Sequence, residues 1–272
     1  MMRNPALISS LLFLILVTSA AQAQEVEPAE SRFTLYDIPP RWLVDMPTAG
    51  TLPRGHYNLG VRLYPRGGGL GYADIGISSR FTLGLSYGGE GIISDQKPNW
   101  NGRVGFSLKF RLVDELEYFP AVTLGFTDQG YGAWYENEDR YTFKSRGFYA
   151  VASRSFYFYK WTSGWHAGIN RSLEATDGPD DDLTVFGGFD ATFDYNLALV
   201  FEYDAAINDD SEAATPLSGK GRGYLNMSVK WLFAENLELE FVLKDLLVNR
   251  RAAPGESNTF SREVRMTYID AF

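Results

Sequence analysis

Apolar and polar residues alternate along most of the chain from position 55 onward. The clearest stretch is 103–112, where every second residue is apolar and the residues between are polar or small; 196–204, 225–233 and 237–244 repeat the design. A period of two places successive side chains on opposite faces of a β-strand. The pattern therefore predicts strands with one apolar and one polar face.

Twelve such segments can be delimited along the chain. Their expected bounds are 56–64, 70–78, 81–88, 102–112, 119–127, 146–155, 163–172, 183–191, 196–204, 222–233, 236–244 and 261–269. These lengths are close to the roughly 9–11 residues that a tilted strand needs to cross a bilayer. Residues 148–153 and 183–190 fit either face assignment, so the orientation of the sixth and eighth strands stays open.

The joins between these segments alternate in length. Short joins lie at 79–80, 113–118, 156–162, 192–195 and 234–235, and longer ones at 89–101, 128–145, 173–182, 205–221 and 245–260; only 65–69 is compact where a long join is expected. Short periplasmic turns and long extracellular loops are typical of outer-membrane barrels. Because hydrocarbon offers no partner to a free N–H or C=O group, such a sheet must close on itself. We therefore predict an all-β fold, a closed antiparallel transmembrane β-barrel of about twelve strands over residues 56–272.

The N-terminal region has a different character. Residues 1–23 combine Arg3, an apolar core over 6–17 and the small-x-small ending Ala21-Gln22-Ala23, the pattern of a cleaved signal peptide. Residues 24–55 are rich in proline, which blocks regular strands. We expect this stretch to be an irregular periplasmic lead-in or a plug of the lumen.

The C-terminus supports an outer-membrane location. The chain ends on Phe272, after alternating residues that include Tyr268. A terminal aromatic residue on such a strand resembles the signal of outer-membrane barrels, so the expected partners are the barrel-assembly machinery, outer-membrane lipid and lipopolysaccharide of a Gram-negative cell. A net charge of −9 argues against nucleic acid as a partner, because phosphate binding needs a basic face.

The polar faces carry charges of both signs into the predicted lumen. The candidate solute-contacting residues are Arg62, Arg103, Lys109, Arg111, His166, Glu202, Glu238, Glu240 and Arg265. A lumen of this kind suits hydrated, charged or sugar-like solutes. It equally suits a wall held shut by ion pairs, and the sequence does not decide between them.

No catalytic constellation is evident. A serine hydrolase needs a hydroxyl nucleophile beside a histidine base, and no serine stands two residues from His166 on the same strand face. Inward carboxylates such as Glu202 and Glu240 could in principle serve glycoside hydrolysis, but opposite inward Arg and Lys they are read more simply as ion-pair partners. We expect a protein that is not an enzyme and has no catalytic residues.

Metal and cofactor binding have little support. The loop residues Asp177, Asp180, Asp181 and Asp182 form a weak candidate cluster for Ca²⁺ or Mg²⁺, but their spacing lacks the full calcium-loop pattern. Solvated acidic loops are common. We therefore predict no metal site and no cofactor.

Three segments carry a resemblance to a known family. Residues 45–55 before the first strand, the hairpin at 75–89, and 239–247 with its Lys244-Asp245-Leu246-Leu247 ending are similar to the YjbH-like outer-membrane barrel proteins associated with exopolysaccharide export. Members of that family are longer and hold more than one barrel, so this chain would be a single-barrel form. The resemblance implies a barrel that helps export or anchor an exopolysaccharide, with polysaccharide and export proteins as partners.

The leading hypothesis is therefore a non-enzymatic outer-membrane barrel assisting exopolysaccharide export or anchoring. A porin for small charged solutes or oligosaccharides is the first alternative. A structural barrel with an ion-paired lumen is the second.

Overall fold

The computed structural model describes residues 38–95, 97–159, 161–174, 180–193, 196–211, 217–251 and 259–272. These residues lie within one compact unit, Thr34–Phe272. The expected signal segment and the first part of the lead-in, residues 24–37, fall outside the described residues. No helix in the described part of the chain is long and apolar enough to cross a membrane.

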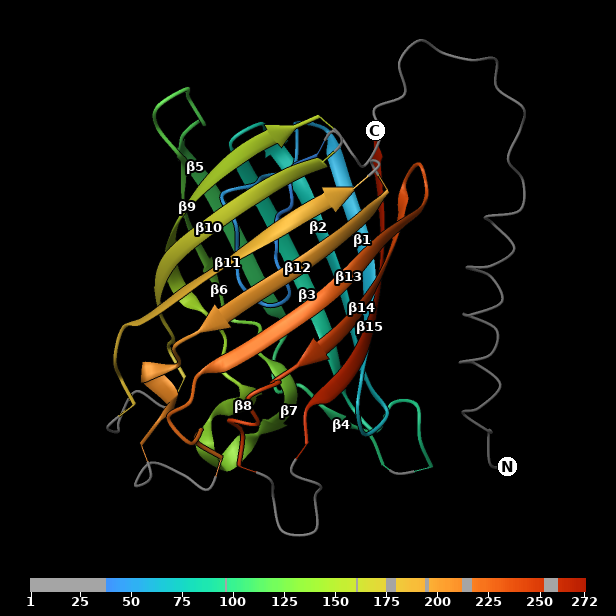
Figure 1. The fold of residues 1–272 in the computed structure, drawn as a ribbon. Coiled ribbons are helices and arrows are strands. Elements are labelled where there is room, and N and C mark those ends of the chain that lie inside the picture. Colours follow the sequence, from blue (N-terminus) through green and yellow to red (C-terminus); the bar gives the residue numbers. More distant parts are fainter. Residues whose placement is uncertain are drawn as a thin grey trace, which may run out of the picture. The chain divides into compact units, whose positions relative to one another are not determined.

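Twelve long strands form one closed antiparallel barrel, as the alternation predicts (Figure 1). They are β1 (His56–Tyr64), β2 (Gly68–Ser78), β3 (Phe81–Glu90), β5 (Gly105–Val113), β6 (Ala121–Thr127), β9 (Gly147–Phe158), β10 (Trp161–Arg171), β11 (Thr184–Phe193), β12 (Leu197–Asp204), β13 (Tyr224–Ala234), β14 (Leu237–Lys244) and β15 (Ser261–Ala271). Three shorter strands lie in the connections: β4 (Asn99–Trp100), β7 (Tyr131–Tyr135) and β8 (Arg140–Phe143).

The first and last strands close the ring. β1 pairs antiparallel with β15, with Val61 opposite Met266. On its other side β1 pairs with β2, which in turn pairs with β3. β6 pairs directly with β9 because the β7–β8 hairpin leaves the sheet between them. Every barrel strand thus has two hydrogen-bonded neighbours, so no strand edge is left to face hydrocarbon.

The outer surface is that of a membrane-spanning barrel. Large apolar side chains such as Leu85, Phe241 and Met266 point outward and remain exposed. Aromatic rings gather near the strand ends, where Trp161 stacks on Phe158 with ring centroids 4.1 Å apart. Aromatic rings of this kind favour the headgroup level of a bilayer.

The connections alternate in length as expected. The turns at 79–80, 114–120 and 235–236, together with the ends at which β9 meets β10 and β11 meets β12, lie at the end that also holds the C-terminus, and the described parts of the longer connections lie at the other end (Figure 1). The compact join 65–67 is the exception that the sequence already indicates. We refer to the two ends as periplasmic and extracellular.

The structure settles the two strands whose orientation the alternation left open. Tyr149 and Val151 of β9 and Phe186 of β11 are buried on the inner face, whereas Phe148 and Val185 are exposed outside. Because β9 and β11 carry apolar residues on both faces, polarity alone does not tell their inner face from their outer face. The apolar residues on the inner face pack against residues 38–55.

Residues 38–55, the plug segment, run inside the barrel in its periplasmic part (Figure 1). Leu43, Val44 and Met46 are at most 1% exposed and form a core with Tyr149, Phe186 and further wall residues. The segment folds back on itself, with the Thr48 amide donating to the Arg41 carbonyl at 3.1 Å. Eight strands already enclose just enough space for their side chains, so a ring of twelve encloses more space than its own side chains fill. The plug segment occupies part of that space.

Candidate functional site

The tightest attachment of the plug segment is to the carboxylate of Glu202 on β12. The backbone amides of Val44, Asp45 and Met46 all donate to it, at 2.8–3.0 Å. The Asn226 side chain donates to the same carboxylate at 2.6 Å. Successive amides around one anion form a concave anion-binding arrangement, so this buried carboxylate fixes the turn of the plug.

Asp45 of the plug is the centre of a buried ion-pair network. Its carboxylate lies 2.7 Å from the Arg62 guanidinium and 2.5 Å from the Lys244 ammonium, and Arg62 also pairs with Glu263. All these side chains are less than 5% exposed. Removing one partner from a buried pair leaves an uncompensated charge, which costs about 3–5 kcal/mol. The loss of any single member is therefore expected to destabilise the network.

Other wall cations hold the carbonyl groups of the plug. Lys109 on β5 donates to the carbonyls of Arg41, Thr48 and Gly50. Three more basic side chains each bind one carbonyl: Arg111 that of Ala49, Arg265 that of Val44 and Lys230 that of Trp42. The basic side chains of the lumen thus donate hydrogen bonds to backbone carbonyls of the plug. Within the described residues, the plug pairs with no strand of the wall.

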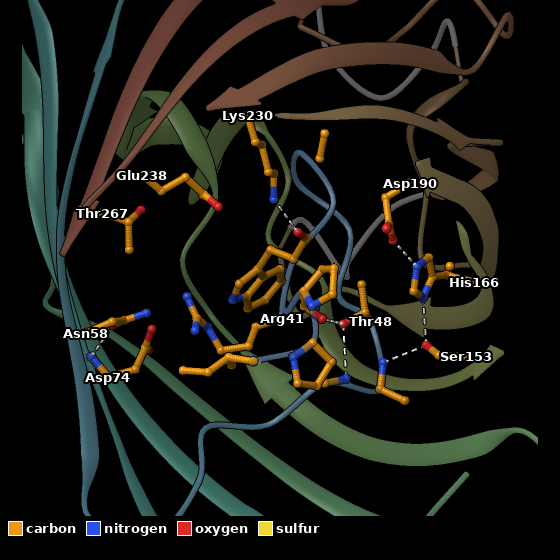
Figure 2. A pocket seen from close by; sticks show the side chains of 18 of the residues that line it. Arg41, Thr48, Asn58, Asp74, Ser153, His166, Asp190, Lys230, Glu238 and Thr267 are labelled. Atoms are coloured by element: carbon orange, nitrogen blue, oxygen red, sulfur yellow. Dashed lines mark hydrogen bonds and ion pairs between the residues drawn. The ribbon is translucent and has the colours of Figure 1, made fainter. Parts of the chain in front are cut away.

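A chain of polar side chains crosses three adjacent strands beside the plug (Figure 2). Ser153 Oγ on β9 lies 2.7 Å from His166 Nδ1 on β10, and His166 Nε2 lies 2.8 Å from Asp190 Oδ1 on β11. The Ala49 amide of the plug donates to Ser153 Oγ at 2.8 Å. All four residues are less than 10% exposed.

A cavity of about 460 Å³ remains between the plug and the wall. His166 and Asp190 line one side of it, and Asp74 and Asn58 lie on the other (Figure 2). Its lining reaches residues next to the periplasmic turns, such as Glu115 and Asn196. This volume falls within the roughly 300–1,000 Å³ of small-molecule sites, so the cavity is large enough to hold a ligand.

The extracellular end carries the cap, which comprises β7, β8 and the described loop residues 144–146, 172–174, 180–183, 205–211 and 217–223. Arg140 of β8 is fully buried and pairs with Asp209 at 2.8 Å. Burial by itself lowers the pKa of Arg140, but the Asp209 carboxylate outweighs it and the net pKa is raised. The ion pair therefore stays charged and holds the hairpin in the mouth of the barrel.

Glu174 joins two parts of the cap. Its carboxylate accepts hydrogen bonds from the amides of Tyr141 at 2.9 Å and Ser145 at 2.8 Å. Burial raises the pKa of Glu174, and these hydrogen bonds offset the rise only in part. The cap is connected to the plug network through Tyr131, whose ring centroid lies 4.1 Å from the Arg62 guanidinium and 4.6 Å from the Lys244 ammonium.

The structure brings most of the predicted lumen residues together. Arg62, Lys109, His166, Glu202, Glu240 and Arg265 are buried inside the barrel, and Arg111 and Glu238 line the cavity. Arg103 does not belong with them. β5 begins two residues later than Arg103, and the exposed Arg103 side chain reaches Asp128 at 3.7 Å in the extracellular connections.

The remaining predicted residues lie apart from the lumen. Asp177 is outside the described residues; Asp180 is buried and accepts a hydrogen bond from the Ser211 amide, and Asp181 pairs with Arg171 at 2.7 Å. Asp182 is exposed. Within the described ranges no group of three or more potential ligands could hold a metal ion. Tyr268 and Phe272 meet Tyr57 at the seam between the first and last strands.

Several functional residues escape the sequence reasoning. Asp45 stands in an irregular proline-rich stretch with no period that predicts its partners. Ser153 is not two residues from His166 but directly opposite it, in the β9–β10 register. Counting residue pairs outward from the short turn between the sixth and seventh predicted strands is the one signal that could have placed Ser153 opposite His166.

Comparisons with known proteins place the chain beside other barrels. No family model matches it, and no curated protein matches it. The solved KdgM porin aligns over 78% of this chain and 98% of its own length, with 10% identity and a TM-score of 0.44, and KdgM has also been solved with disordered oligogalacturonate. The NanC porin aligns over 79% of this chain and 99% of its own, with 8% identity and a TM-score of 0.45. At these values the likeness extends no further than barrel architecture.

Proposed function

We propose that the protein is a gated porin of the outer membrane, closed at rest, which passes small hydrophilic solutes when the plug segment withdraws. The observation that carries this proposal is the plug itself. A separate, irregular part of the chain fills a lumen whose wall is polar and charged, and the wall binds it through side chains rather than through strand pairing. Such contacts can be exchanged for contacts with a solute and water.

The solute class follows from the groups that withdrawal would free. Lys109, Arg111 and Lys230 would lose carbonyl partners, and Glu202 would lose amide partners. Hydroxyl and carboxyl groups such as those of Asp74 and Thr267 already face the cavity (Figure 2). Mixed donors and acceptors suit small charged solutes or oligosaccharides, which need no chemical change to pass.

Polysaccharide export or anchoring is the second candidate. It rests on the resemblance to the YjbH-like family and is favoured by one observation, the extension of the cavity lining to residues beside the periplasmic turns. A polymer made inside the cell reaches the outer membrane from that side. The cap would then have to open outward as the chain emerges.

A liposome-swelling assay tests the porin proposal. The variants are a chain lacking residues 38–50 and the same deletion combined with Arg140→Gln, each checked for a heat-modifiable band that reports a folded barrel. We expect the doubly altered barrel to admit arabinose and short oligosaccharides that the unaltered barrel excludes. A folded, doubly altered barrel that admits none of them would contradict the proposal and favour a purely structural role.

A further inference from the structure

Ser153, His166 and Asp190 are arranged as the parts of a nucleophilic site. In the antiparallel register Ser153 lies directly opposite His166, and Asp190 lies opposite Gly164, two residues before His166. All three side chains point inward and line the cavity. Nucleophile, base and orienting acid within hydrogen-bond reach of one another are the geometric signature of an activated serine.

The hydrogen bonds allow the protonation that an activated serine needs. The Ala49 amide donates to Ser153 Oγ, which leaves the hydroxyl hydrogen able to point at His166 Nδ1. In the tautomer with its proton on Nε2, His166 donates to Asp190. That tautomer is the one that can remove the Ser153 proton, with the imidazolium that forms stabilised by the Asp190 carboxylate.

Gly164 keeps the space in which this contact forms. A methyl group at Gly164 would lie 2.5 Å from Asp190 Oδ1 and 2.8 Å from His166 Nε2. Any larger residue would therefore displace the carboxylate or the imidazole. The sequence Trp-Thr-Ser-Gly-Trp-His of β10 supplies the residue without a side chain at this position.

The plug places Ala49 against the serine. The residue whose amide meets Ser153 Oγ, Ala49, has its carbonyl oxygen held by two donors, Thr123 Oγ1 at 2.9 Å and Arg111 Nε at 3.1 Å. Acyl transfer needs donors near 2.7–3.1 Å from the oxygen that becomes negative. Ala49 thus contacts the serine through its amide and a pair of oxyanion-type donors through its carbonyl oxygen.

We propose that Ser153, His166 and Asp190 form an acyl-ester hydrolase site on the lumen wall, and that Ala49 blocks it as an internal substrate mimic. The proposal rests on the withdrawal of the plug segment proposed above. Once Ala49 has left, an ester carbonyl takes its place, with its oxygen on Thr123 and Arg111.

The reaction is an acyl transfer to water. Ser153 Oγ forms a bond to the ester carbon while its proton passes to His166, and the ester C–O bond then breaks as His166 returns the proton to the leaving alcohol. Water, deprotonated by His166, attacks the acyl group on Ser153 and releases a carboxylic acid. Asp190 is a positioning residue that holds the imidazole throughout.

The site favours a short acyl group on a polar alcohol. Ala49 carries only a methyl side chain and is 1% exposed, so little room surrounds the carbonyl position. Hydroxyl and charged groups are among those that line the cavity beyond it, and the lining reaches residues beside the periplasmic turns. An acetyl ester of a small hydroxylated compound fits both conditions.

Covalent labelling with diisopropyl fluorophosphate tests the site. Ser153 Oγ attacks phosphorus, the P–F bond breaks, fluoride leaves and the proton goes to His166, so the adduct is read by mass spectrometry on Ser153 itself. The proteins are the unaltered chain, Glu202→Gln to weaken the plug, and the chain lacking residues 38–50. Planar-bilayer conductance of the same samples reports on the gate, with Arg140→Gln added to open the cap.

We expect Ser153 to be labelled slowly in the unaltered chain and at least about tenfold faster when the plug is weakened or removed. In the deleted chain, His166→Gln should slow labelling by about 10²–10⁴-fold, the usual contribution of a general base. Asp190→Asn should slow it and shift its pH profile, whereas Ser163→Ala, which removes another buried hydroxyl of the same cavity, should leave it unchanged.

The possible failures are distinguishable. A folded, conducting plug-deleted barrel in which Ser153 is not labelled would overturn the hydrolase site and leave the gated porin standing. Labelling of Ser153 that does not depend on His166 would also overturn it. Labelling of Ser153 in barrels that never conduct would support the site and refute the gate.

Discussion

Replacing Glu202 by glutamine should release the plug segment without disturbing the barrel. The carboxylate accepts hydrogen bonds from three consecutive plug amides. A hydrogen bond to a charged group contributes about 1.5–3 kcal/mol and a neutral one about 1 kcal/mol, so the change weakens each bond by roughly 1 kcal/mol. The sum is about 3 kcal/mol.

Part of that loss is offset. Glu202 lies next to Asp45, whose amide it binds, so two carboxylates share one buried region. Removing one negative charge relieves their repulsion, and we expect a net loss of about 2 kcal/mol in plug closure. Since about 1.4 kcal/mol corresponds to a factor of ten, the open fraction should rise about 30-fold.

Cysteine modification measures that fraction directly. The chain has no cysteine, so Met46→Cys, at a plug position 1% exposed, gives a single reactive thiol. Its modification by a charged thiosulfonate should be about 30 times faster with Glu202→Gln than without. Glu238→Gln, a wall carboxylate that lines the cavity, is the matched control and should change the rate little. Equal rates in all three proteins would refute the assigned role of Glu202.

Three further predictions concern the plug core, the cap and the seam. Leu43→Ala should destabilise plug closure by about 2–5 kcal/mol, because Leu43 is fully buried in the plug core; an unchanged modification rate at Met46→Cys would contradict this. Because the pKa of Glu174 is raised in the folded cap, its ionisation opposes closure, so cap stability should fall as pH rises from about 4.5 toward 7. Hydrogen exchange of residues 140–146, corrected for intrinsic rates, measures this, and a pH dependence that survives in Glu174→Gln would count against it. Deleting Phe272, whose ring lies 4.9 Å from that of Tyr57, should slow barrel assembly in cells, seen as less heat-modifiable protein; normal yields would argue against an assembly role.

The barrel could be predicted because its wall obeys a simple rule. Where one face meets lipid and the other meets polar groups, as over Glu202 and Asp204 of β12, alternation identifies the inner residues directly. β9 and β11 break the rule because Val151 and Phe186 pack on the apolar side of the plug. Apolar residues on the inner face of a membrane barrel strand therefore indicate that a further segment packs inside the barrel.

The contents of the lumen could not be predicted in the same way. Asp45 meets Arg62 and Lys244 only because the plug turns inside the ring, and no local pattern specifies a contact across such distances in sequence. Arg103 was placed in the lumen because alternation continues past the true start of β5. Ser153 and Asp190 reach His166 through strand register, which a single-strand search does not examine.

Single-channel recording tests most directly whether the chain closes its own lumen. The unaltered protein and the variant lacking residues 38–50 with Arg140→Gln would be compared in planar bilayers, after both show a heat-modifiable band. We expect no steady current through the unaltered barrel and a stable, voltage-independent conductance through the variant. Equal steady currents through both, or silence from the folded variant, would contradict closure by the plug segment and the cap.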